Sequence, residues 1–559
     1  MKSIQPSTSR GSTPLAPIRR IVGSILSLAL LASSPFVMAQ DFNEPDSSDA
    51  PWSVLSASPY VPDPSFNQSL YVAEPYPGQQ NNSQLGRKIL RLSNGDVIVA
   101  AVGSKHDGAL GDPPVNLILA RYNAAGQNVS WSNPGAVGYH FNMYVVFPNT
   151  SDPTSGASVK DVLDIKLFGN RIFVLVDHAF QNTSDIDSVI LVFGTDGSYL
   201  GSTNVLNSTL PEYSGGMYIY GNGTFPETVG IAVVASTFNG VWRPTFISGT
   251  VNANSSITFA APAFPNPGNY CPTNRGCILR SVAAGGRGAT GFPNRLYLAG
   301  TRQASIPDNN DWDFLVMAVN FNGTSLTSFG GAGVTTVPFF EGGANYNDAN
   351  SIQVETSGIV GSVHDALYVS GYVERECKDG FGVAKIKDDG ALDTTFGKPN
   401  GGARTGKLVL GGAAPAVLGS CSDFLPFSTS ASYANASALA NGKLAIAGFT
   451  DKFNLPACIS GQPCHEDDLD GMIAVIDTAH GDVDSFRTYA YTGTVNGPRT
   501  RHSGFWGISE SGGGTFTATG VVRYFEAAPG QPSGAQKIGT LRVSSDTIFA
   551  NDFDGTSGN

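Results

Sequence analysis

The segment from Cys464 to Asp470 (CHEDDLD) holds four carboxylates within five residues. Carboxylate oxygens are the ligands that Ca²⁺ prefers in proteins, so Asp467, Asp468 and Asp470 are a candidate calcium site. The segment lacks the alternating D-x-D-x-D-G order of an EF-hand loop. An acidic loop in contact with solvent is therefore the favoured interpretation, and calcium is the only cofactor that the sequence indicates.

The six cysteines form two short loops and one distant pair. Cys271 to Cys277 (CPTNRGC) and Cys458 to Cys464 (CISGQPC) each enclose five residues rich in turn formers, which predicts two local disulfides. Cys377 and Cys421 would then pair over a longer range, one of the fifteen connectivities that six cysteines allow. Zinc sites favour C-x2-4-C pairs, and the export signal described below favours disulfides, so we expect disulfides rather than a metal site.

Motifs of the common enzyme classes do not occur in the sequence. It contains no G-x-S-x-G nucleophile elbow, no H-E-x-x-H metal motif and no G-x-x-x-x-G-K-[ST] phosphate loop. The seven histidines are scattered, and none stands at ligand spacing from another: His106, His140, His178, His364, His465, His480 and His502. We therefore assign no catalytic residue from the sequence and expect a binding protein rather than an enzyme.

Composition indicates a folded chain built from β-strands. Glycine accounts for 67 of 559 residues, hydrophobic residues for 41% and charged residues for 14%. Ordinary globular domains are about 25% charged, and a disordered chain would be far less hydrophobic. No stretch shows sustained apolar periodicity of 3.6 residues, so few helices are expected.

Residues 1–39 have the features of an export signal. A basic start that ends at Arg19 and Arg20 precedes a short apolar core, Ile21–Leu31, and Val37–Ala39 supplies small residues for a cleavage site. That core is shorter than the roughly 20 residues needed to span a bilayer, and no later segment is suitable. We expect an exported protein, located in the periplasm, on the outer surface or outside the cell, without a membrane span.

The net charge of the mature chain limits the classes of partner that it can bind. Residues 1–39 hold four basic and no acidic residues, so the remainder carries 29 Lys and Arg against 45 Asp and Glu. An acidic excess of this size disfavours nucleic acid and anionic lipid, since both require a basic face. We expect a monomer whose partner is a macromolecule or a glycan at the cell surface.

A pattern of turn and apolar run recurs seven times. In each copy a turn rich in Gly, Asn or Pro opens onto a short apolar run that soon meets Gly or another small residue. The copies lie near Asn94, Gly169, Glu227, Pro293, His364, Asn441 and Gly513. A further apolar run follows each copy, and in five copies it enters a glycine-containing turn: AAGQ, TDGS, FNGT, DDGA and AHGD.

The second strands of these copies begin 59 to 77 residues apart, from near Val97 to near Phe516, which suits a four-stranded blade. We therefore predict an all-β chain that forms a seven-bladed β-propeller over residues 62–545. The second, third and seventh copies are the least regular, so six or eight blades remain open. A strand within Pro62–Gly78 is expected to pair with the last blade and close the ring. A flexible segment at 40–61 and a tail at 546–559 complete the expected organisation.

One segment carries a family resemblance. At Gly390 the chain reads GALDTTFGKPNGGARTGKLVL, after a strand that reads FGVAKIKDDG. This resembles the exported delta-60 repeat family, whose units carry a GSLDTTFG segment. Weaker copies are NGTSLTSFG at Asn322 and PDPSFN at Pro62, and NGKLAIAGFT at Asn441 resembles the family's DGKIVVAGYS strand. The family is thought to form β-propellers and mostly has no assigned function, so the resemblance implies fold and export and transfers no catalytic residue.

The leading functional hypothesis is an exported β-propeller that acts as a non-enzymatic binding or cell-surface interaction module. The long loops near 104–115, 303–311 and 451–470 are its candidate contacts, because scaffold loops usually carry recognition. The alternative is a propeller hydrolase or lyase that acts on a glycan or lactone at the central channel. A purely structural envelope protein is the third hypothesis.

Overall fold

A computed structural model describes residues 60–545 within a compact unit formed by Asp49–Asn559. The undescribed positions inside that range are 64, 67–71, 75–83, 105–114, 128, 130–157, 180–185, 206–211, 222–228, 239, 264–270, 272–274, 288–292, 305–310, 340–345, 357–363, 376–377, 398, 401–402, 411–430, 452–468, 490–499 and 525–535. The predicted export signal at 1–39, most of the segment 40–61 and the tail at 546–559 lie outside the described residues.

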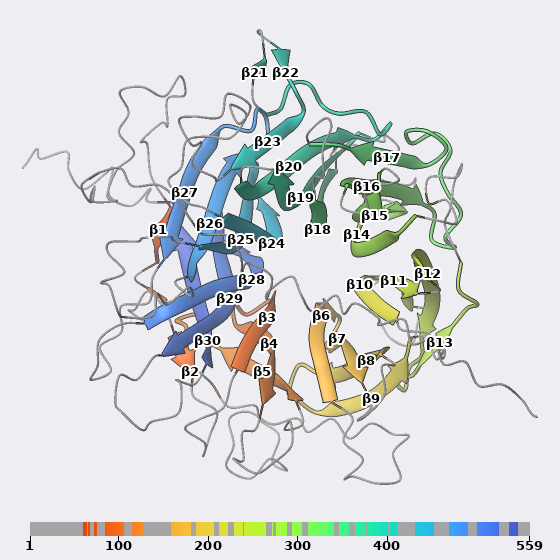
Figure 1. Cartoon of the computed structure of the whole chain (residues 1–559). Coiled ribbons are helices and arrows are strands. Elements are labelled where there is room, and N and C mark those ends of the chain that lie inside the picture. The colour runs from red at the N-terminus through yellow and green to blue at the C-terminus, as the bar shows by residue number, and fades with distance from the viewer. Residues whose placement is uncertain are drawn as a thin grey trace, which may run out of the picture. The chain divides into compact units, whose positions relative to one another are not determined.

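The described residues form the predicted seven-bladed β-propeller (Figure 1). Every regular element among these residues is a β-strand. The first three blades are β3 (Gln84–Arg91), β4 (Val97–Ser104) and β5 (Val115–Tyr122); β6 (Ser158–Phe168), β7 (Arg171–Ala179), β8 (Ile186–Gly194) and β9 (Tyr199–Asn204); and β10 (Glu212–Tyr220), β11 (Val229–Phe238), β12 (Trp242–Val251) and β13 (Ile257–Phe259).

Blades 4 to 7 continue in the same antiparallel order. They are β14 (Cys277–Arg287), β15 (Pro293–Gln303), β16 (Trp312–Val319) and β17 (Val334–Val337); β18 (Asn347–Thr356), β19 (Asp365–Arg375), β20 (Lys378–Lys387) and β23 (Lys407–Leu410); β24 (Ala431–Ala440), β25 (Lys443–Asp451), β26 (Leu469–Asp477) and β27 (Val483–Tyr489); and β28 (Thr500–Gly512), β29 (Thr515–Tyr524) and β30 (Gln536–Ser544). A small ribbon of β21 (Pro399–Asn400) and β22 (Ala403–Arg404) extends from blade 5.

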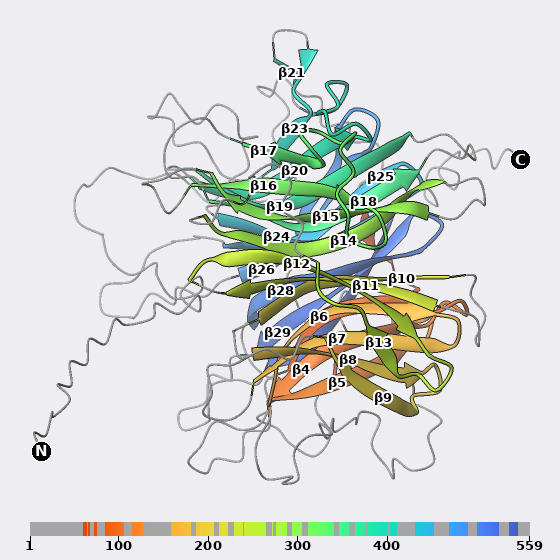
Figure 2. The same cartoon turned by 90° about the vertical axis from the view of Figure 1, so that its right-hand side faces the viewer.

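The blades form a closed ring, and the first strand of each blade lies at the inner side of the ring. These strands, β3, β6, β10, β14, β18, β24 and β28, contact one another in sequence, and β28 contacts β3. Figure 2 shows that strands of neighbouring blades run side by side in one general direction. Seven hydrophobic clusters each combine side chains of two adjacent blades, so the core lies between blades.

The predicted closure by an N-terminal strand is confirmed. β1 (Val61–Pro62) and β2 (Val72–Glu74) both pair antiparallel with β30 of the last blade. The pairing begins at Val61, one residue before the expected boundary, and Tyr60 is already buried against this blade. The closing segment therefore starts slightly earlier in the chain than the sequence suggested.

Each first strand contains a β-bulge at the same height of the ring. The bulged residues are Arg87, Leu163, Gly215, Arg280, Asn350, Asn435 and Trp506. In four blades the second strand places a glycine opposite the bulge: Gly300, Gly371, Gly448 and Gly520. A Cβ at Gly300 would lie 1.9 Å from the carbonyl oxygen of Ile278, so the bulge excludes a side chain there. This close approach explains why the apolar runs of the repeat meet glycine.

The predicted glycine turns are confirmed as well. Gly126, Gly197, Gly323, Gly390 and Gly481 follow the third strands and have φ between 73° and 88°. Such left-handed conformations strain residues that carry a Cβ, which explains the recurrence of glycine at this point of each repeat.

Candidate functional site

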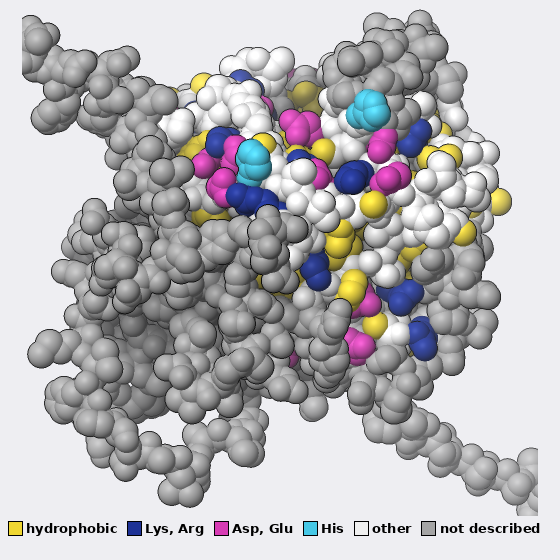
Figure 3. Space-filling view, turned by 90° about the horizontal axis from the view of Figure 1, so that it is seen from above, with side chains coloured by type: hydrophobic (Ala, Val, Ile, Leu, Met, Phe, Trp, Pro, Cys, Tyr) yellow, Lys and Arg dark blue, Asp and Glu magenta, His cyan; other side chains and the backbone are white. Residues whose placement is uncertain are grey.

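On the face that Figure 3 shows, the described side chains are of mixed type. Figure 3 shows Lys and Arg side chains interspersed with Asp and Glu on one face, with hydrophobic side chains scattered among them. Among the described residues, the exposed large hydrophobic side chains are Tyr199 and Leu200. A mixed surface of this kind is typical of contact with solvent.

The ring encloses a central cavity of about 610 Å³, and all seven blades line it. The lining residues come from the first strands, mostly from the bulge toward the carboxyl end of each strand. The second and third strands predicted from the sequence form the framework behind this wall. Because the first strands meet only when the ring closes, the site depends on contacts between distant parts of the chain.

Most charged side chains of the cavity wall are neutralised by a neighbour. Lys166 Nζ lies 3.0 Å from Asp164 Oδ1, and Arg280 lies 3.2 Å from Asp348 Oδ2. Glu510 Oε2 lies 3.5 Å from Arg91. The proximity of Asp348 raises the pKa of Arg280, so this guanidinium stays charged.

Lys88 is the exception in this wall. It follows the bulge of β3 and lines the cavity, and no hydrogen bond or ion pair joins its ammonium to any residue that the structure describes. Burial lowers the pKa of Lys88, and Lys166 and Arg87 lower it further, although Asp164 and Asp161 oppose the shift. The amine therefore lacks the partner that a buried charge usually has.

Amide side chains line the wall in blades 5 and 6. Asn350 Nδ2 donates to the carbonyl oxygen of Ala434 at 2.9 Å, and Gln353 Nε2 donates to that of Ser437 at 2.8 Å. Asn435 Nδ2 donates in the same way to the next blade, at 2.8 Å from an oxygen of β28. Each amide therefore bridges two blades and is held in one orientation.

The bulge residue of blade 1, Arg87, also connects blades. Arg87 forms an ion pair with Asp161 of blade 2 at 2.9 Å. Its guanidinium lies 5.5 Å from the ring centroid of Trp506 in blade 7. The bulge residues of several blades thus contact the neighbouring blades. These contacts fix the width of the cavity.

None of the described residues that line the cavity is a site residue predicted from the sequence. Asp467 and Asp468 lie outside the described residues, and Asp470 belongs to β26, although its side chain is not described. Within the described part of the chain, no group of three His, Cys, Asp or Glu side chains could hold a metal ion. The predicted contact loops 104–115, 303–311 and 451–470 are described only at their ends.

One of the predicted disulfides is confirmed. Cys271 and Cys277 are bonded, with 5.9 Å between their Cα atoms, and both side chains are buried. The partner predictions for Cys377, Cys421, Cys458 and Cys464 concern residues outside the described part. The confirmed bond fixes the loop that leads into β14, one of the strands that line the cavity.

Sequence reasoning missed the cavity residues, although a signal was present. The first strand of blade 2 reads KDVLDIKLF, in which Asp164 and Lys166 alternate with apolar residues. Such alternation predicts a strand with one polar face, and the central channel is the place where a first strand meets water. Which charge would remain unpaired could not be read from the alternation.

Comparisons with known proteins give remote similarities. No family model and no curated protein matches the chain. A polysaccharide lyase, Uly1, is 10% identical, over 88% of this chain and 98% of that one, with a TM-score of 0.40. An ulvan lyase of family PL25, solved with -[GlcA(1-4)Rha3S]-, is 10% identical over 84% and 95%, with a TM-score of 0.42.

A third similar structure comes from a different class of protein. The WD40 domain of SCAP from fission yeast is 11% identical, over 84% of this chain and 98% of that one, with a TM-score of 0.30. Similarity at this level does not establish a shared activity. In the part of the chain that the structure covers, no helix is long and apolar enough to cross a membrane.

Proposed function

We propose that this chain is an exported, non-enzymatic binding propeller that holds a small organic anion in its central cavity. Lys88 is the observation that carries the proposal. It is a cationic side chain in a wall whose other charges are paired, and its ammonium has no acceptor among the described residues. A carboxylate or sulfate beside Lys88 would supply the missing partner.

The energetics favour an anion over a neutral ligand. Partial burial of an ammonium without a partner is costly, and this cost is why desolvation lowers the pKa of Lys88. An anion within hydrogen-bonding distance favours the charged amine and raises its pKa again. Near the pKa of Lys88, anion binding should therefore be accompanied by proton uptake, and affinity should fall as the pH rises through that pKa.

Isothermal titration calorimetry on the chain from residue 40 tests this proposal. Carboxylates, sugar acids and sulfated sugars would be titrated in two buffers that differ in ionisation enthalpy, so that proton uptake is measured directly. Lys88→Met should weaken binding about 10- to 100-fold, because a charge-assisted hydrogen bond is lost. Lys387→Met is the matched control, since Lys387 is exposed and lies outside the cavity wall. An anion that binds wild type and Lys88→Met equally would contradict the proposal.

The alternative is a hydrolase or lyase that acts on a glycan or lactone in the same cavity, and Lys88 also favours it. A lowered pKa makes the neutral form of the amine more accessible, and the neutral amine can accept a proton from a carbon next to a carboxylate. Incubation with uronate-containing polysaccharides and with lactones, followed by detection of unsaturated products or new reducing ends, separates the two functions. Turnover that Lys88→Met abolishes would favour the enzyme.

Further parts of the proposal have direct tests. N-terminal sequencing of the secreted protein checks cleavage after Ala39. Sedimentation checks the monomeric state. Calcium titration of wild type and of an Asp467→Asn, Asp468→Asn double variant checks the candidate calcium site. Membership of the delta-60 family and a glycan or macromolecular partner at the cell surface remain predictions.

A further inference from the structure

We infer that the anion is a hydroxylated acid of sugar size, oriented with its carboxylate toward blade 1 and its hydroxyl groups toward blades 5 and 6. The inference rests on the proposed function and deepens it. It comes from blades 5 and 6, where three amide side chains present oxygen atoms to the cavity, two of them on the blade across the axis from Lys88.

The two walls face each other because of the ring order. Blade 1 supplies Lys88, and in a closed ring of seven blades the fourth and fifth blades lie across the axis from the first. Asn350 and Gln353 belong to β18 of blade 5, across the axis from Lys88, and Asn435 belongs to β24 of blade 6, between blade 5 and blade 7. A ligand that spans the cavity would therefore contact Lys88 at one end and Asn350 and Gln353 at the other, with Asn435 beside them.

The orientation of the amides determines what they can bind. The NH₂ groups of Asn350, Gln353 and Asn435 are used in hydrogen bonds to backbone oxygens of the next blade. Their oxygens, by contrast, accept no hydrogen bond from any described residue and are not enclosed by protein atoms. This wall thus offers acceptors whose positions are fixed in advance by contacts between blades.

The amide oxygens are hydrogen-bond acceptors and therefore favour ligand groups that can donate. An ionised carboxylate has no hydrogen-bond donor. An ionised carboxyl group placed against three amide oxygens would face only acceptors, whereas hydroxyl groups could donate to each of them. Ser281 and Ser351 line the same side, and their hydroxyl oxygens accept hydrogen bonds from the backbone amides of Ile352 and Ser437, each at 3.3 Å. The cavity of about 610 Å³ is large enough for a sugar acid with one or two rings.

Titration of three classes of ligand tests the inference. Glucuronate carries both features, succinate carries carboxylates without hydroxyl groups, and glucose carries hydroxyl groups without a carboxylate. We expect glucuronate to bind most tightly. Gln353→Leu should weaken glucuronate about 3- to 10-fold, the value of one neutral hydrogen bond, and leave succinate nearly unchanged. Asn170→Leu, at an exposed turn outside the cavity, is the control for replacing an amide with leucine.

The ratio of the two affinities is the decisive readout. Because both ligands are measured on the same folded protein, a partial loss of folded Gln353→Leu does not change that ratio, and Asn435→Leu provides a second, independent variant. If succinate binds as tightly as glucuronate and the ratio is the same in both variants, the inference is overturned while the anion site stands. If none of the acids binds, the proposed function fails as well.

The nature of the donor is tested separately. An amino acid such as serine would present an ammonium to the amide oxygens, and tighter binding of serine than of glucuronate would overturn the inference. Digalacturonate distinguishes a free sugar acid from the end of a glycan chain. Binding of digalacturonate at least as tight as that of galacturonate would identify a glycan end as the ligand, and exclusion of digalacturonate would identify a free acid.

Discussion

The guanidinium of Arg542 lies over the ring of Phe66, with Cζ 4.2 Å from the ring centroid. Its Nε donates to Thr517 Oγ1 at 3.1 Å within blade 7, and its NH1 donates to the backbone oxygen of Ala124 in blade 1 at 2.7 Å. The amide of Asp63 in the closing segment donates to the backbone oxygen of Arg542 at 2.8 Å. One residue therefore connects the last blade, the closing segment and the first blade.

Replacement of Arg542 should weaken the closure of the ring. Arg542→Met keeps much of the aliphatic stem and removes two hydrogen bonds and the cation–π contact, which together should cost about 2 to 4 kcal/mol of unfolding free energy. Urea unfolding followed by tryptophan fluorescence measures the change. Lys387→Met, on an exposed residue, should change stability by less than about 0.5 kcal/mol. Equal stability of the two variants would show that this contact does not hold the ring closed.

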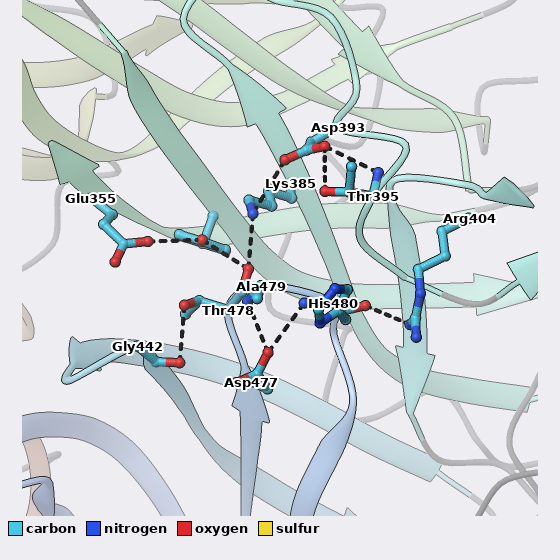
Figure 4. A network of polar contacts seen from close by, with 11 residues as sticks. Glu355, Lys385, Asp393, Thr395, Arg404, Gly442, Asp477, Thr478, Ala479 and His480 are labelled. Carbon is cyan, nitrogen blue, oxygen red and sulfur yellow. Dashed lines mark hydrogen bonds and ion pairs between the residues drawn. The ribbon is translucent and has the colours of Figure 1, made fainter. Parts of the chain in front are cut away.

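The same arrangement recurs between blades 5 and 6 (Figure 4). Lys385 Nζ lies 6.0 Å from the ring centroid of Phe396, donates to the backbone oxygen of Thr478 at 2.9 Å and lies 3.2 Å from Asp393 Oδ2. Asp393 Oδ1 accepts from both the amide and the hydroxyl of Thr395, as Asp63 does from Ser65. The LDTTFG and PDPSFN segments therefore have equivalent roles. In each, a phenylalanine packs against a cationic side chain that donates a hydrogen bond to the next blade.

Removal of the aromatic ring of Phe396 in blade 5 should lower the stability of the protein. Phe396 is fully buried, and a Cβ at Gly481 of the next blade would lie 3.0 Å from its ring. Phe396→Ala should destabilise the protein by about 3 to 5 kcal/mol because it leaves a cavity between two blades. Thr394→Ala in the same segment is the control, since Thr394 is exposed and should change stability little. Thermal and urea unfolding of both variants check this, and a small effect of Phe396→Ala would mean that the segment is only a turn.

The sequence was informative wherever local chemistry determines structure. The apolar runs after each turn are the second and third strands, and glycines such as Gly390 mark turns with positive φ. The PDPSFN segment was expected to contribute to closure, and its neighbours β1 and β2 pair with β30. These features depend on short stretches of chain, so a pattern in the sequence is enough to find them.

The cavity could not be predicted in the same way. Lys88 and Gln353 are separated by most of the chain, and only the closed ring places them on opposite walls. The bulge that turns each first strand toward the axis shifts the strand register by one residue, and nothing near Lys88 in the sequence marks that shift. The sequence instead predicts a candidate site in the acidic loop at Asp467, because the charged residues of that loop are adjacent in sequence.

The glycines opposite the bulges should tolerate no side chain. A Cβ at Gly520 would lie 1.7 Å from the backbone oxygen of Gly504, and backbone atoms cannot move aside as a flexible side chain can. Gly520→Ala should therefore cost about 3 kcal/mol or abolish folding. Gly216→Ala is the matched control, because the nearest atom to its Cβ would be Asp164 Oδ2 at 3.4 Å, an ordinary contact. Comparable stability of the two variants in urea would show that the bulge relaxes easily.

Asp313 should make the stability of the propeller depend on pH. Burial, with the nearby Asp311, raises the pKa of Asp313 from 3.8 to about 6, although Arg302 and Lys407 oppose the shift. The folded protein thus binds this proton more tightly than the unfolded chain. The stabilising contribution is complete below about pH 4 and is lost as the pH rises through about 6.

Asp313→Asn should remove that dependence, because asparagine cannot ionise. A shift of about two pKa units corresponds to roughly 3 kcal/mol, so the variant should be more stable than wild type by up to that amount near pH 7.5 and similar to it near pH 4. Urea unfolding at both pH values measures the difference. Asp196→Asn is a control of opposite sign, since hydrogen bonds from Ser198 lower the pKa of the exposed Asp196. If Asp313→Asn and wild type lose stability in parallel as the pH rises, this carboxyl group is not the one that titrates.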